Sequence, residues 1–108
     1  MGRFLAVASF HNNPDEHINR TFENILNQTH QDWLLIVGDD FSDDPEFKRR
    51  LKRKVVEIND PRIIYYQVGE RRELYLYQNM FRHYQYDYYF DLDTDDIIDP
   101  NLFEIYSN

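Results

Sequence analysis

Four carboxylates stand within six residues near the carboxyl end of the chain, at Asp91, Asp93, Asp95 and Asp96. The aromatic run 88–90 before them is typical of a buried strand. Carboxylates this close together repel one another by roughly 1 kcal/mol per pair at surface dielectric. Hard cations such as Mg²⁺ or Mn²⁺ prefer carboxylate oxygens, and a site with few protein ligands leaves positions for substrate phosphates. The spacing predicts a metal site at the strand end, with a solvated acidic loop as the alternative.

A calcium loop of the EF-hand type is a further alternative, because Asp91, Asp93 and Asp95 occupy alternating positions. Such a loop needs a glycine at its sixth position and a glutamate at its twelfth, with a helix before it. Here these two positions hold Asp96 and Leu102, and a strand is expected before the loop. The EF-hand interpretation is therefore excluded.

The composition limits the class of protein. The 108 residues predict one domain over 1–108, and the lack of cysteine excludes disulfides and thiolate metal sites. No run approaches the roughly 18 apolar residues of a membrane span and no signal pattern is present, so we expect a soluble, cytoplasmic protein. The net charge of −8 argues against nucleic-acid binding. The basic run 48–54 is an exception that predicts either a solvated helix face or contact with an anionic surface.

Apolar runs and helical periodicity alternate along the chain. The strands that we expect are 3–9, 33–37, 62–68 and one from about 87. The helices that we expect are about 14–28, 45–58 and 73–84. This alternation predicts an α/β fold with a mainly parallel sheet and right-handed crossover helices.

Helix-start signals precede the first two helices. We expect Asn13 to cap the first, with Pro14 in its first position and Glu16 completing a capping box. The second is expected to begin after a cap at Ser42 or Asp44. Each helix thus starts a few residues after a strand ends, as a crossover requires.

Ligands of parallel sheets bind at the carboxyl ends of the strands, which here are 9–12, 38–40 and 91–96. Asp39 and Asp40 leave a buried strand beside the acidic segment, which favours a ligand role over a turn or capping role. His11 follows the first strand, and for it both ligand contact and simple solvation stay open. The remaining histidines have no ligand-like spacing; they are His17, His30 and His83.

The common phosphate-binding and nucleophilic motifs are absent. The chain has three glycines and neither a Walker A loop nor a G-x-G-x-x-G turn. No nucleophile with a neighbouring base stands out either. A metal at the acidic cluster is therefore the natural holder of any phosphate, and Arg71 and Arg72 could either assist it or be solvated.

Two separated motifs resemble those of family 2 glycosyltransferases, the first made of two neighbouring stretches. Residues 25–29 read ILNQT and residues 37–44 read VGDDFSDD, where the family pattern is ILNQT, a strand and then VDDGSTD. Residues 92–97 read LDTDDI and resemble the LDSDD segment with the D-x-D motif. The resemblance runs from about Phe4 to the end of the chain. It implies the Rossmann-like GT-A fold, a three-layer sandwich with a mainly parallel sheet, and a nucleotide-sugar donor whose diphosphate is bridged by Mn²⁺ or Mg²⁺.

The family roles carry over to individual positions. Asp93 is implied near the ribose and the metal, Asp95 as the best metal ligand, and Asp96 as a helper. The nucleotide-binding residues that the resemblance and the strand ends imply are Ser9, Phe10, His11, Asp39, Asp40, Arg72, Asn79 (or Gln78) and Asp93. The chain departs from the family pattern at Gly38, at Phe41 and at the first strand end, all near the expected base contacts.

The acidic pair indicates the nucleoside. Uracil presents an N–H between two carbonyls, and a carboxylate at Asp39 or Asp40 can accept that proton, whereas cytosine lacks it. A UDP-sugar is therefore favoured over a CDP-sugar, and thymidine and guanine nucleotides stay open.

The resemblance implies transfer of the sugar to a saccharide or other hydroxyl acceptor. Family members continue past the D-x-D motif with an acceptor half that carries the catalytic base, so the base is expected beyond Asn108. Asp99 and Glu104 are assigned to the start of the next helix instead, with Asp99 as its cap. The alternative function is a non-catalytic module that binds a nucleotide or a partner.

Overall fold

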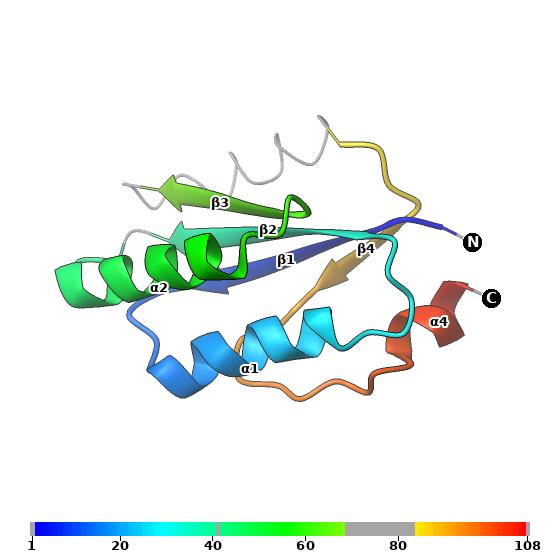
Figure 1. The fold of residues 1–108 in the computed structure, drawn as a ribbon, viewed down its shortest axis with the longest axis horizontal. Coiled ribbons are helices and arrows are strands. Elements are labelled where there is room, and N and C mark those ends of the chain that lie inside the picture. Colours follow the sequence, from blue (N-terminus) through cyan, green and yellow to red (C-terminus); the bar gives the residue numbers. More distant parts are fainter. Residues whose placement is uncertain (1, 41, 69–83, 108) are drawn as a thin grey trace.

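The fold is seen in a computed structural model that describes residues 2–40, 42–68 and 84–107. Its elements in chain order are β1 (Phe4–Phe10), α1 (Asp15–Leu26), β2 (Trp33–Asp40), α2 (Pro45–Ile58), β3 (Ile63–Val68), β4 (Tyr88–Asp91) and α4 (Leu102–Ser107) (Figure 1). The predicted helix at 73–84 falls almost entirely outside the described residues, as do Arg71, Arg72, Gln78 and Asn79. The predicted strands and the first two helices are present, with ends shifted by a few residues.

The four strands form one parallel sheet in the order β3-β2-β1-β4. β1 is central, and Phe4 lies opposite both Trp33 of β2 and Tyr88 of β4. β2 continues past its expected end near Gly38 to Asp40, because it is paired there with β1 or β3. The parallel α/β prediction is confirmed, and the carboxyl ends of β1, β2 and β4 meet at one edge of the sheet (Figure 1).

Helices α1 and α2 lie on the same face of the sheet (Figure 1). Alternate β1 residues face them and belong to one buried cluster with the apolar sides of both helices. The residues between, Leu5 and Val7, join Ile36 in a second buried cluster on the opposite face, against which Tyr84 packs. A sheet buried on both faces explains the continuous apolar run of β1 in the sequence.

The two helix starts compare differently with their predictions. At α2 the cap is confirmed, because the Asp44 side chain accepts a hydrogen bond of 3.0 Å from the Glu46 N–H. At α1 the predicted capping box is wrong: Pro14 occupies the cap position and no side chain caps the helix. The Asn13 carboxamide instead accepts from the His11 N–H at 2.6 Å and donates to Thr94 at 3.3 Å. Tertiary partners have thus replaced the local cap.

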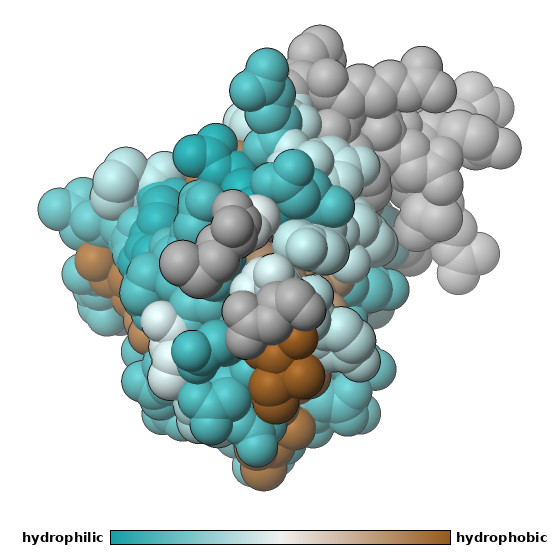
Figure 2. Space-filling model, turned by 90° about the vertical axis from the view of Figure 1, so that its right-hand side faces the viewer, coloured by the Kyte–Doolittle hydropathy of each residue, from teal (hydrophilic) through white to brown (hydrophobic). Residues whose placement is uncertain are grey.

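The basic run 48–54 lies on α2. Arg49 is paired with Glu46 and Arg50 with Asp15, both at 2.7 Å, which fits the solvated helix face among the two interpretations. Figure 2 shows that the end of the molecule with both termini is mainly hydrophilic, with small groups of hydrophobic residues. Within the described ranges, no helix is long and apolar enough to cross a membrane.

Candidate functional site

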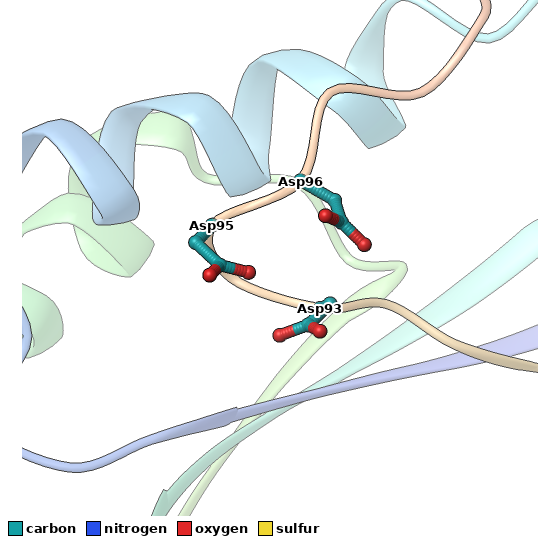
Figure 3. A group of neighbouring side chains, drawn as sticks. All are labelled: Asp93, Asp95 and Asp96. Carbon is teal, nitrogen blue, oxygen red and sulfur yellow. The ribbon is translucent and has the colours of Figure 1, made fainter.

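Three aspartates of the predicted acidic cluster come together in the turn after β4. One carboxylate oxygen each from Asp93, Asp95 and Asp96 lies within 4.8 Å of the other two, and all three side chains are exposed. The Asp96 N–H donates to the Asp93 carbonyl at 3.3 Å and closes the turn. Figure 3 shows the three carboxylates on the loop beside α1. Asp91 belongs to the end of β4 and not to this group.

The cluster is electrostatically unfavourable without a cation. Loss of hydration and then the charges of Asp95 and Asp96 raise the pKa of Asp93 above its usual 3.8. Because the pKa of Asp93 in the folded chain exceeds that in the unfolded chain, its ionisation lowers stability as pH rises through these values. A bound divalent cation would offset this cost.

An open cavity of about 360 Å³ adjoins the acidic turn; its lining residues are Ser9, Asp91, Leu92, Asp93, Thr94 and Asp96. Ser9 is the one exposed residue of β1, and every other residue of that strand is buried. The end of β1 and the acidic turn therefore form one polar depression, as the parallel sheet predicts.

The structure separates the two aspartates at the end of β2. Asp39 is fully buried, and its Oδ1 accepts from the Ser42 N–H at 3.2 Å. Its Oδ2 is buried without a hydrogen-bond partner among the described residues. Burial and then the Asp39 charge raise the pKa of Tyr65. Asp40 is half-buried, and strand alternation places it on the same sheet face as Ser9.

The other predicted nucleotide residues at the end of β1 have defined positions. The Phe10 side chain is buried in the core, 6.3 Å from Phe47 between ring centroids, so only its backbone is available to a ligand. The His11 ring is exposed, and its Nδ1 lies 2.8 Å from the Asp40 carbonyl oxygen. His11 therefore links the ends of β1 and β2.

Asn12 also links these two strand ends, and sequence reasoning missed it. Its backbone is left-handed, with φ of 48°, and its N–H donates to the Ser42 hydroxyl at 3.1 Å. Its carboxamide donates to Asp43 at 2.7 Å, which lowers the pKa of that carboxyl, and accepts from the Asp44 N–H at 3.2 Å. The available signal was an asparagine between a strand and a helix, since asparagine tolerates this conformation.

We expect Asn12→Ala to destabilise the fold more than Asn12→Gly. Both variants lose the side-chain hydrogen bonds to Asp43 and Asp44, but only alanine adds the strain of a left-handed backbone, about 1 kcal/mol. Urea unfolding of both variants measures the difference. Equal unfolding free energies, or a more stable alanine variant, would show that the backbone at position 12 is not strained.

Comparison with known proteins decides the family. The family model described as Glycosyl transferase family 2 matches residues 6–105. The chain belongs to this family. Comparison with curated protein sequences gives no match.

Solved glycosyltransferase structures share the fold. One is a mannosyltransferase, PcManGT from Pyrobaculum calidifontis in complex with GDP-Man and Mn²⁺, with 18% identity, a TM-score of 0.67 and coverage of 89% of this chain and 28% of that chain. Another is TarS 1–349 of S. aureus in complex with UDP-GlcNAc, with 18% identity, a TM-score of 0.68 and coverage of 97% and 30%. The family 2 chain spans less than a third of either structure, and the GT-A fold expected from its sequence is confirmed.

Proposed function

We propose that this family 2 chain binds a nucleoside diphosphate sugar together with Mn²⁺ or Mg²⁺. The protein to which it contributes would transfer the sugar to an acceptor hydroxyl. The observation that carries the proposal is the group of three carboxylates within 4.8 Å of one another. They lie at the carboxyl end of the parallel sheet, where β1 and β2 also end. The complex of PcManGT with GDP-Man and Mn²⁺ supports this combination of ligands.

The acidic turn fits a hard divalent cation. All its donors are carboxylate oxygens, and an octahedral Mg²⁺ with bonds of about 2.1 Å places its ligand oxygens roughly 3 to 4 Å apart. Asp93 and Asp95 would hold the ion, with Asp96 assisting. The bound cation would supply charge stabilisation for the diphosphate leaving group. The exposure of the carboxylates leaves that side of the ion open to phosphate oxygens.

Ser9 and Asp40 would bind the nucleoside. Both are on the sheet face that α1 and α2 do not cover, and neither is fully buried. Asp40 can accept the imide N–H of uracil, or an N–H of guanine. Asp39 would instead hold the turn at Ser42 by its buried carboxylate. A UDP-sugar remains our first choice of donor, with a GDP-sugar as the alternative.

The two carboxylates after the acidic turn already have partners. Asp99 Oδ1 accepts from the Asn101 N–H at 2.8 Å, and Glu104 accepts from the Thr29 hydroxyl at 2.7 Å. α4, with Glu104, lies at the end of the sheet opposite the acidic turn (Figure 1). We therefore propose that the base that deprotonates the acceptor comes from outside this chain.

Calorimetric titration of the chain with UDP, GDP and CDP, each with and without Mn²⁺, tests the proposal. We expect binding that requires the metal, and a preference for UDP over CDP of at least about tenfold from one charge-assisted hydrogen bond. Incubation with UDP-sugars and Mn²⁺ then shows whether the bound donor is also hydrolysed. Absence of metal-dependent binding for all three nucleotides would rule out the proposed function, and hydrolysis of the bound donor would rule out the non-catalytic module.

A further inference from the structure

Buried polar side chains on α1 and just after it face the chain that follows β4. Thr21 and Asn24 lie on α1, and Gln28 lies two residues past its end at Leu26; each of the three is at most 7% exposed. Polar side chains are rarely buried without hydrogen-bond partners. Here the partners include backbone groups of the segment 94–103, which runs beside α1 from the acidic turn to α4 (Figure 1).

Asn24 binds this segment with both ends of its carboxamide. Its Nδ2 donates to the Asp96 carbonyl oxygen at 2.8 Å, and its Oδ1 accepts from the Ile98 N–H at 3.2 Å. Gln28 repeats the arrangement one turn later, with Nε2 donating to the Asp99 carbonyl at 2.9 Å and Oε1 accepting from the Phe103 N–H at 3.1 Å. Each carboxamide thus satisfies one backbone acceptor and one donor.

Two further contacts reach the acidic turn from the preceding turns of α1. The Arg20 guanidinium donates to the Asp95 carbonyl at 3.0 Å, and the Thr21 hydroxyl lies 3.4 Å from the Thr94 carbonyl. The Thr21 hydroxyl is closer to the His17 carbonyl, at 2.8 Å. The backbone carbonyls of Asp95 and Asp96 therefore accept from α1 side chains, whereas the carboxylates of Asp93, Asp95 and Asp96 project together into solvent (Figure 3).

This arrangement opposes the charge repulsion within the acidic turn. Three like charges would spread apart if the turn were free to move, because each separation lowers their repulsion. Hydrogen bonds from α1 to the backbone oppose that movement without occupying a carboxylate oxygen. The metal-binding oxygens would therefore stay grouped before any cation arrives, which reduces the cost of ordering them on binding.

We propose that Asn24 is a positioning residue for the metal site: through the Asp96 carbonyl it holds the acidic turn from behind in the arrangement that binds the cation. This inference rests on the proposed function, because it assumes that the turn binds a divalent cation. The hydrogen bonds to Asp99 and Phe103 also give a physical role to Gln28 of the ILNQT stretch.

The test is a titration of the chain with Mn²⁺. Electron paramagnetic resonance measures the free Mn²⁺, at a temperature where every variant is folded. Asn24→Ala should raise the Kd for Mn²⁺ by about tenfold, the range found when groups that orient metal ligands are removed. Amide hydrogen exchange should also become faster at Ile98, whose N–H loses its acceptor. If Asn24→Ala does not fold, Asn24→Ser provides the same comparison.

Two controls separate positioning from general stability. Ile25→Val destabilises α1 from its buried core side, and Asn19→Ala removes an exposed carboxamide from the same helix; both should leave Mn²⁺ affinity unchanged. Equal Mn²⁺ affinity in Asn24→Ala and the parent, with faster exchange at Ile98, would overturn this inference but leave the proposed function standing. A parent chain that binds no Mn²⁺ would overturn the metal part of the proposed function, and this inference with it.

Discussion

Asp95→Asn is expected to weaken Mn²⁺-dependent UDP binding by more than about 100-fold, because it removes a charged ligand and not merely a group that orients one. The substitution keeps the shape of the side chain, so the packing of the turn should not change. The measurement is calorimetric titration of UDP at fixed Mn²⁺, with circular dichroism to confirm the fold.

The same substitution should not lower the stability of the metal-free chain, although it weakens UDP binding. Asp95→Asn removes repulsion from Asp93 and Asp96, so the free energy of unfolding without metal should stay equal or rise by about 1 kcal/mol. Asp91→Asn is the matched control, since Asp91 lines the same cavity but is outside the group of three. A loss of UDP affinity in Asp91→Asn as large as that in Asp95→Asn would indicate a general field effect and contradict a ligand role for Asp95.

Asp40→Asn is expected to abolish the preference for UDP over CDP. Under the proposed function the aspartate would accept the imide N–H of uracil with its full charge, whereas an asparagine can only accept it through an uncharged Oδ1 and can equally donate its N–H to cytosine. The lost charge-assisted hydrogen bond corresponds to about 1.5 to 3 kcal/mol, or roughly 10- to 150-fold in the Kd for UDP. Cytosine has an acceptor nitrogen at this position, so the affinity for CDP should be kept or improved. Titration of UDP and CDP into parent and variant, at fixed Mn²⁺, measures the change.

The adjacent Asp39→Asn is a matched control with the opposite expectation. Its Oδ1 can still accept from the Ser42 N–H, and the substitution removes the charge of a buried oxygen that has no partner among the described residues. The free energy of unfolding should therefore rise, and the ratio of UDP to CDP affinity should not change. If Asp39→Asn loses the preference for UDP over CDP and Asp40→Asn keeps it, then Asp39 and not Asp40 contacts the base.

The sequence by itself determined the class of fold and the place of the candidate site. Continuous apolar runs such as Phe4–Ala8 indicate strands buried on both faces, and helical periodicity between them indicates crossovers, so a parallel sheet follows. A parallel sheet places its strand ends together, which brings Ser9 near the acidic turn although they are far apart in the sequence. The two signature segments were enough to predict the family that the comparison confirmed.

Only the tertiary structure decided which member of the pair Asp39 and Asp40 is buried. Asp39 and Asp40 are equivalent in composition, and the pairing of β2 turns one into the core and the other toward the face of Ser9. Asn13 was predicted as a cap from local spacing, but Thr94 and the His11 backbone compete for its carboxamide. Asn24 gave no signal, and Gln28 stood out only as part of the ILNQT stretch, because their partners in the segment 94–103 lie more than 70 residues away along the chain. Periodicity reports which face of an element is buried, whereas a hydrogen bond between distant segments exists only once the chain has folded.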